Sequence, residues 1–155
     1  VMEEKETLLY HSEILLQGLK VLEIPMILTQ QYTKGLGMTV KEIAEAAGTE
    51  EYVDKITFSA YECVKEKIWD KKYVIICGIE THICVLQTVI DLKAAGFVPV
   101  VVEDCVASRK GNDKKVALER MRDERALITT YESLLFELLK EAGTEKSKKI
   151  QRLIK

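Results

Sequence analysis

Histidine and paired cysteines, the usual protein ligands of zinc, are scarce in this sequence of 155 residues. The two histidines, His11 and His82, lie far apart. The cysteines are Cys63, Cys77, Cys84 and Cys105. None of them forms a CxxC pair, so the spacing gives no support for a zinc site and we expect no metal. No GxGxxG motif follows a predicted strand, which argues against a dinucleotide-binding domain, and we expect no cofactor.

Neither an excess of positive charge nor a long apolar run is present. There are 23 basic and 25 acidic residues, a formal net charge of −2, which gives no indication of a nucleic-acid partner or an anionic membrane surface. No apolar run approaches the roughly 20 residues needed to span a bilayer. The segment Val1–Tyr10 is too acidic and too weakly apolar for a signal peptide. We therefore expect a cytoplasmic protein with free thiols and no membrane or nucleic-acid partner.

What the sequence does contain is a regular alternation of apolar helices and short apolar strands. Helices are predicted over 7–23, 40–47, 61–69, 83–95, 115–124 and 133–141, and strands over 26–29, 53–58, 73–77, 98–102 and 127–130. The β-branched runs Tyr73–Cys77 and Val98–Val102 are typical of strands buried on both faces. This order predicts an α/β fold of three layers, α/β/α, with a Rossmann-like, mostly parallel sheet and helices on both faces.

The chain divides into one domain, residues 1–143, and a lysine-rich C-terminal tail, residues 144–155. The domain is long enough to bury a substantial core, and the sequence has no internal repeat. Over Glu145–Lys155 the apolar residues form no face wide enough to dock alone. The composition therefore predicts a solvated tail or frayed helix, with docking onto a partner subunit as the alternative.

Cys84 differs from the other cysteines in its position. Ligands of open α/β sheets bind beyond the carboxyl ends of the strands, where segments 30–37, 58–61 and 78–84 lie. Cys84 stands where one such loop turns into a helix, whose N-terminus stabilises a thiolate and whose N–H groups can hold an oxyanion. On position alone, a small buried thiol that begins a helix is the stronger interpretation. The surrounding residues change this balance.

Several stretches carry a family resemblance. One is the run 78–88 (GIETHICVLQT), with 101–109 (VVEDCVASR) after the following helix. Another is 55–60 (KITFSA), a lysine followed by an aromatic-serine-small triplet. Together with 118–121 (LERM) and 128–133 (ITTYES), they make residues 12–142 resemble the isochorismatase-like cysteine hydrolases. The loop 30–37 (QQYTKGLG) resembles the isochorismatase-domain-containing subgroup.

The resemblance implies roles for the matched residues. Cys84 is the expected nucleophile, which attacks a carbonyl carbon and forms a thioester that water hydrolyses. Lys55 is expected near the sulfur, where its charge favours the thiolate and the tetrahedral intermediate; the alternative is a surface lysine. A cis peptide is expected between Ile79 and Glu80. It would direct the N–H groups of Glu80 and Cys84 into one oxyanion hole.

Four more residues of these motifs are expected to bind substrate. Tyr32 and Phe58 are predicted to line the pocket, with a plain core role as the alternative. His82 is predicted as a pocket-wall residue and not a base, because the family does not use it as one. Thr81 is assigned to the same pocket and also fits a helix cap.

The chain departs from the family pattern in its first strand. The family's third catalytic residue is an aspartate at the end of that strand, and no aspartate here has a matching context. The strand would be central, between strands 26–29 and 73–77, and its loss would leave buried backbone groups unpaired. We therefore expect the sequence to be incomplete at its N-terminus by about 20 residues.

The second departure concerns the substrate. Nicotinamidases of the superfamily carry a DxHxxxH-type metal cluster, but no histidine occurs from Tyr32 to Asp54. Isochorismatases generally lack the cysteine, so Cys84 indicates an amide or similar acyl substrate. We interpret the sequence as a metal-independent cysteine hydrolase of a small molecule and, as the resemblance implies, a homo-oligomer. The alternative is a catalytically degenerate oligomeric interaction module, which would be free to lose Cys84 and Lys55, yet both are present.

Overall fold

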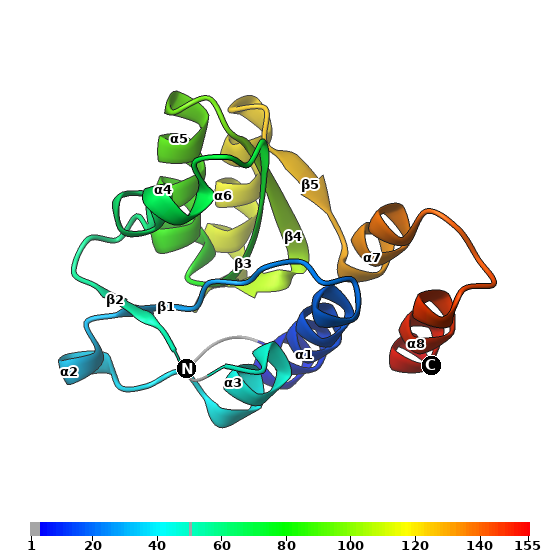
Figure 1. The fold of residues 1–155 in the computed structure, drawn as a ribbon. Helices are drawn as coiled ribbons and strands as arrows, with labels where there is room; N and C mark the ends of the chain where they lie inside the picture. The colour runs from blue at the N-terminus through cyan, green and yellow to red at the C-terminus, as the bar shows by residue number, and fades with distance from the viewer. Residues whose placement is uncertain (1–3, 50) are drawn as a thin grey trace.

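A three-stranded parallel sheet forms the middle layer of the computed structural model, which describes residues 4–49 and 51–155 (Figure 1). Its strands, in spatial order, are β3 (Tyr73–Ile79), β4 (Val98–Ala107) and β5 (Leu127–Thr129). The central strand, β4, pairs in parallel with both neighbours. Its apolar, β-branched residues suit a strand that is covered on both faces. The predicted parallel α/β arrangement is confirmed.

Helices cover both faces of this sheet. The helices of one face are α4 (Tyr61–Ile68), α5 (Leu86–Ala94) and α6 (Gly111–Asp123), and those of the other face are α1 (Lys5–Val21), α7 (Tyr131–Leu139) and α8 (Glu145–Ile154). Val101 packs in the core with α4, α5 and α6, whereas Val100 and Val102 pack with α1, α7 and α8. Successive strand residues point to opposite faces, so β4 contributes to both cores and three layers result.

A second, smaller sheet carries part of the candidate site. Its strands β1 (Thr29–Gln31) and β2 (Val53–Lys55) are parallel and are connected through α2 (Thr33–Leu36) and α3 (Lys41–Ala47). Within the described ranges, neither strand pairs with β3. The strand predicted over 26–29 is therefore shifted. Met26 and Leu28 pack beside α1 and α3, and pairing begins at Thr29, where β2 provides a partner.

The last residues of β4 bring the loop after β3 next to the turn between β4 and α6. β4 reaches Ala107 and so exceeds the predicted strand over 98–102. Its register against β3 shifts, because Ile76 pairs with Val101 but Gly78 pairs with Val106. The extra residues place the end of β3 beside the turn that leads into α6.

The C-terminal segment corrects the prediction of a solvated tail at 144–155. It forms α8, which begins after Thr144, whose hydroxyl accepts a hydrogen bond from the Ser147 N–H. Ile150 is fully buried in the core shared with α1 and α7, and Leu153 and Ile154 pack against the same core. These three residues share one helix face at i, i+3 and i+4. The segment therefore docks onto the chain's own core through this apolar face.

Candidate functional site

The loop after β3 has an unusual backbone that its sequence allows. Gly78 has a φ of +115°, which residues with a side chain rarely adopt. The peptide bond between Ile79 and Glu80 is cis, as the family resemblance implied. The next five residues, Thr81–Val85, form a π-helical turn that continues into α5. Such turns frequently occur at functional sites, and this one carries Cys84.

Lys55 lies at the end of β2, buried to 7% exposure. Its ammonium donates to Gln31 Oε1 at 2.5 Å, to the Thr57 carbonyl at 3.1 Å and to the Phe58 carbonyl at 2.7 Å. Three neutral acceptors therefore use its three N–H groups. None of the ion pairs found between described residues includes Lys55. The surface-lysine alternative is wrong, because the ammonium is buried and bonded to neutral acceptors.

Gln31 joins Lys55 to Cys84. Its Oε1 atom accepts from Lys55 and lies 4.0 Å from Cys84 Sγ. Its Nε2 atom donates to the Ile56 carbonyl at 2.6 Å, which fixes the orientation of the amide. Sequence reasoning missed this residue. Its side chain reaches Lys55 because strand pairing places the two residues opposite one another, and the local sequence does not specify that register.

A network of charged and polar side chains surrounds the first residues of the cysteine loop. Glu80 forms an ion pair with Arg109 at 2.8 Å and accepts from the Arg109 backbone N–H at 3.2 Å. His82 Nδ1 lies 2.9 Å from the hydroxyl of the buried Ser108, and its Nε2 lies 3.9 Å from Asp113. These contacts fasten the loop to the turn between β4 and α6. Ser108 and Arg109 were not predicted as site residues.

The four residues predicted to bind substrate have different surroundings. Tyr32 is 49% exposed and Phe58 is 52% exposed, so the plain-core alternative is wrong for both. The Tyr32 N–H donates to the Lys55 carbonyl at 2.8 Å, and His82 is half-buried in the network described above. Thr81 is fully buried and its hydroxyl has no partner among the described residues. The helix-cap prediction for Thr81 is wrong, and its side chain has no exposed surface for a ligand.

The remaining cysteines are less suited to nucleophilic chemistry. Burial raises the pKa of Cys77 to about 11 and also raises the pKa of Cys105. Both are free thiols, as predicted, and both stay protonated at neutral pH. Cys63 is also free, and its thiol donates to the Ala60 carbonyl at 3.0 Å.

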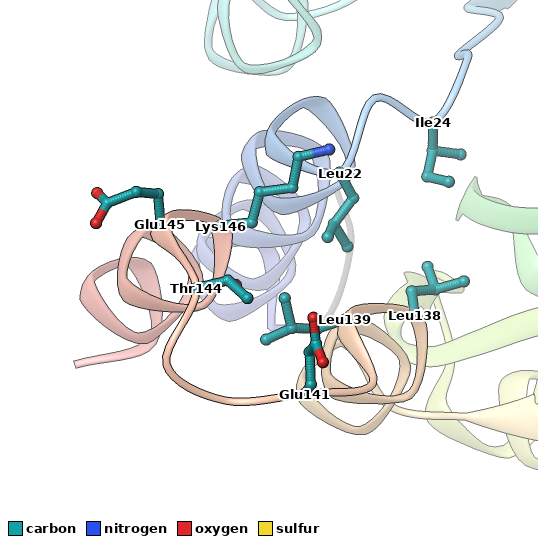
Figure 2. Close-up of a pocket in the computed structure, with 8 residues that line it drawn as sticks. All are labelled: Leu22, Ile24, Leu138, Leu139, Glu141, Thr144, Glu145 and Lys146. Carbon is teal, nitrogen blue, oxygen red and sulfur yellow. The ribbon is translucent and has the colours of Figure 1, made fainter.

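One cavity lies away from these residues. It has a volume of about 360 Å³ and lies between the C-terminal end of α1 and the loop that connects α7 to α8 (Figure 2). Apolar and charged side chains line it together, namely Leu22, Ile24, Leu138, Leu139, Glu141, Thr144, Glu145 and Lys146. None of the residues near Cys84 or Lys55 lines it. In the part of the chain that the structure describes, no cluster of three metal-ligating side chains occurs, and no helix is long and apolar enough to cross a membrane.

Comparison with known proteins gives consistent matches. A family model described as the isochorismatase domain matches residues 1–133. A secreted isochorismatase effector of Phytophthora sojae is 38% identical, over 96% of this chain and 75% of the relative. Isochorismatase domain-containing protein 1 of Danio rerio is 39% identical over 91% of this chain, which spans only 51% of that relative.

Solved structures share the fold. A structure described as the MAR1 ribonuclease of Caenorhabditis elegans superposes with a TM-score of 0.92 at 34% identity, covering 99% of this chain and 81% of the other. The YcaC gene product of Escherichia coli, described as an octameric hydrolase of unknown specificity, has a TM-score of 0.81 at 24% identity, covering 89% and 71%. At 24% identity, the match to the YcaC structure shows a shared fold alone.

Proposed function

The chain belongs to the isochorismatase family of hydrolases, and on that basis we propose that it is a metal-independent cysteine hydrolase of a small amide, with Cys84 as nucleophile. The observation that carries the proposal is the shared contact of Cys84 and Lys55 with Gln31 Oε1. This contact brings a thiol at the end of one sheet within a few ångströms of a buried cation on the other. A cysteine with a purely structural role does not require a buried cation nearby.

The proposed chemistry has two stages. The Cys84 thiolate forms a bond to the acyl carbon, and the carbonyl π electrons move to oxygen. The tetrahedral intermediate then collapses: the C–N bond breaks, the amine leaves with a proton taken from solvent, and a thioester remains. Water attacks the thioester, the C–S bond breaks, and a carboxylic acid leaves while a proton of the water restores the thiol. Lys55 stabilises the thiolate and the oxyanion through its charge, and the N–H groups of Glu80 and Cys84 form the oxyanion hole. The family's proton-accepting aspartate has no matched residue in this sequence.

Tyr32, Phe58 and His82 form the walls of the proposed binding site. Tyr32 and Phe58 are attached through their backbones to Lys55, so both lie at the edge of the charged centre. Two exposed aromatic rings favour a substrate with a flat or apolar part beside its amide. We propose Gln31 as a further contact, because its amide is the group between the lysine and the sulfur.

Three features of the relatives bear on this chain, namely assembly, ribonuclease activity and compartment. We propose self-assembly, supported by the exposed side chains of Leu36, Met38 and Ile56, and size-exclusion chromatography with light scattering tests it. Ribonuclease activity, named for the C. elegans structure, is disfavoured because the net charge of −2 provides no electrostatic attraction for RNA. Free thiols support the cytosol as the compartment, although the Phytophthora relative is secreted.

The test combines covalent trapping with turnover. Wild type, Cys84→Ala and the control Cys63→Ala are incubated with a panel of small aliphatic and aromatic amides, with isochorismate and an RNA as additional substrates. We expect amine release and a thioester adduct on Cys84 by intact-mass spectrometry in wild type and Cys63→Ala, and neither in Cys84→Ala. Equal activity in Cys84→Ala, or turnover of RNA or isochorismate alone, would refute the proposal.

A further inference from the structure

We propose that Thr88, one helical turn after Cys84, is a positioning residue that sets the separation between Cys84 and Lys55. The inference builds on the proposed function, because it concerns the same nucleophile and cation. Thr88 lies on α5 and is 8% exposed. Its hydroxyl is therefore placed among protein atoms and makes defined contacts with them.

The hydroxyl of Thr88 forms two hydrogen bonds. It donates to the backbone carbonyl of Cys84 at 2.7 Å and accepts from the backbone N–H of Ala60 at 2.9 Å. A hydroxyl has one proton to donate and lone pairs to accept with, so both bonds form at once. A threonine that bonds to the carbonyl four residues earlier does not strengthen its own helix. The bond to Ala60 is thus the informative one.

Ala60 ends the short loop that holds Lys55. Two carbonyls of that loop, those of Thr57 and Phe58, accept from the Lys55 ammonium. Thr88 consequently links the backbone of the nucleophile to the segment that holds the cation. Among the hydrogen bonds of the described residues, it is the only one between α5 and residues 56–60. The link closes a ring with Gln31, which contacts Lys55 and Cys84 from the other side.

The ring joins two parts of the chain that each carry one of the reacting groups. β2 carries Lys55 and pairs with β1, whereas Cys84 follows β3. The packing of α4 against α5 brings the two segments together, and the Thr88 bond fixes the loop of residues 56–60 at a defined distance from Cys84. Reactivity that depends on a nearby charge falls steeply with misplacement, and a shift of about 1 Å can cost up to about 100-fold.

The experiment compares Thr88→Val, which removes the hydroxyl, with Thr88→Ser, which keeps it. The measured quantity is the rate of iodoacetamide alkylation at Cys84, followed by peptide mass spectrometry at mildly acidic pH. We expect Thr88→Val to be roughly tenfold slower than wild type and Thr88→Ser to be within about twofold. Ser147→Ala is the matched control, because Ser147 is also a buried helix hydroxyl bonded to a backbone carbonyl, in α8.

A double-mutant cycle with Lys55→Met separates positioning from general destabilisation. If Thr88 acts through the lysine, Thr88→Val slows alkylation by less than about twofold once Lys55 is methionine. An equal slowing in both backgrounds, or a wild-type rate in Thr88→Val, would overturn the proposal. Hydrogen exchange of the Ala60 amide gives a second readout: Thr88→Val must lose protection there, and unchanged protection counts against the link.

Failure of the proposed function has a different outcome. In that case no amide is hydrolysed and Cys84 in wild type is alkylated no faster than Cys63. Hydrogen exchange of the Ala60 amide then tests the Thr88 link independently, because its protection does not depend on catalysis.

Discussion

Replacement of Lys55 by methionine provides a quantitative test of the proposed charge effect. Lys55 Nζ and Cys84 Sγ contact Gln31 Oε1 at 2.5 Å and 4.0 Å, so they are at most about 6.5 Å apart. At that separation and an effective dielectric constant near 20, a cation and a thiolate attract by about 2.5 kcal/mol. Lys55→Met removes this attraction, and about 2.5 kcal/mol corresponds to roughly 70-fold in the rate of a step that needs negative charge on the sulfur. Solvent screening at the half-buried sulfur sets a lower limit near tenfold.

Alkylation of Cys84 under neutral conditions measures this loss directly. We expect the rate for Lys55→Met to fall by between about tenfold and 70-fold relative to wild type. The matched control is Lys41→Met, because Lys41 is exposed on α3 and pairs with Glu45 at 3.3 Å. Circular dichroism checks that each variant is folded. A folded Lys55→Met protein that reacts within twofold of wild type would show that the lysine does not support the thiolate.

Two further predictions concern stability. Ile150→Ala should cost about 2–5 kcal/mol in urea unfolding because the side chain is fully buried, whereas Val116→Ala, at an exposed position, should change stability by less than about 0.5 kcal/mol. A loss below about 1 kcal/mol for Ile150→Ala would indicate that α8 is not docked. Burial raises the folded-state pKa of Cys77 from near 9.0 to about 11, so its contribution is intact below pH 9 and declines as pH rises to about 11. The stability advantage of wild type over Cys77→Ala should shrink by up to roughly 3 kcal/mol across that interval, and a constant difference would contradict the raised pKa.

The sequence was most informative where one local pattern determines the structure. The β-branched runs 73–77 and 98–102 predicted the parallel strands, because a strand buried on both faces needs apolar side chains in succession. The rule that ligands bind at the carboxyl ends of such strands singled out Cys84, and the family resemblance implied that Lys55 lies near its sulfur. The structure brings both to Gln31.

The missed features depend on contacts between distant segments. Nothing in the local sequence of Gln31 or Thr88 specifies a bond to Lys55 or Ala60, since such bonds follow from strand pairing and helix packing. The prediction of a solvated tail at 144–155 failed for a similar reason. Its few apolar residues predict exposure when they are considered alone, but Ile150 meets a core that α1 and α7 have already formed. Composition does not report the shape of that receiving surface.

The pairing of β4 also determines which part of the domain opens last. β4 pairs on both edges and supplies both major cores, so its amide protons should exchange only when the whole domain unfolds. β3 is bonded to β4 along its length, and Cys84 follows β3 after a short turn. The backbone that carries the proposed nucleophile is therefore anchored to the segment with the highest expected protection.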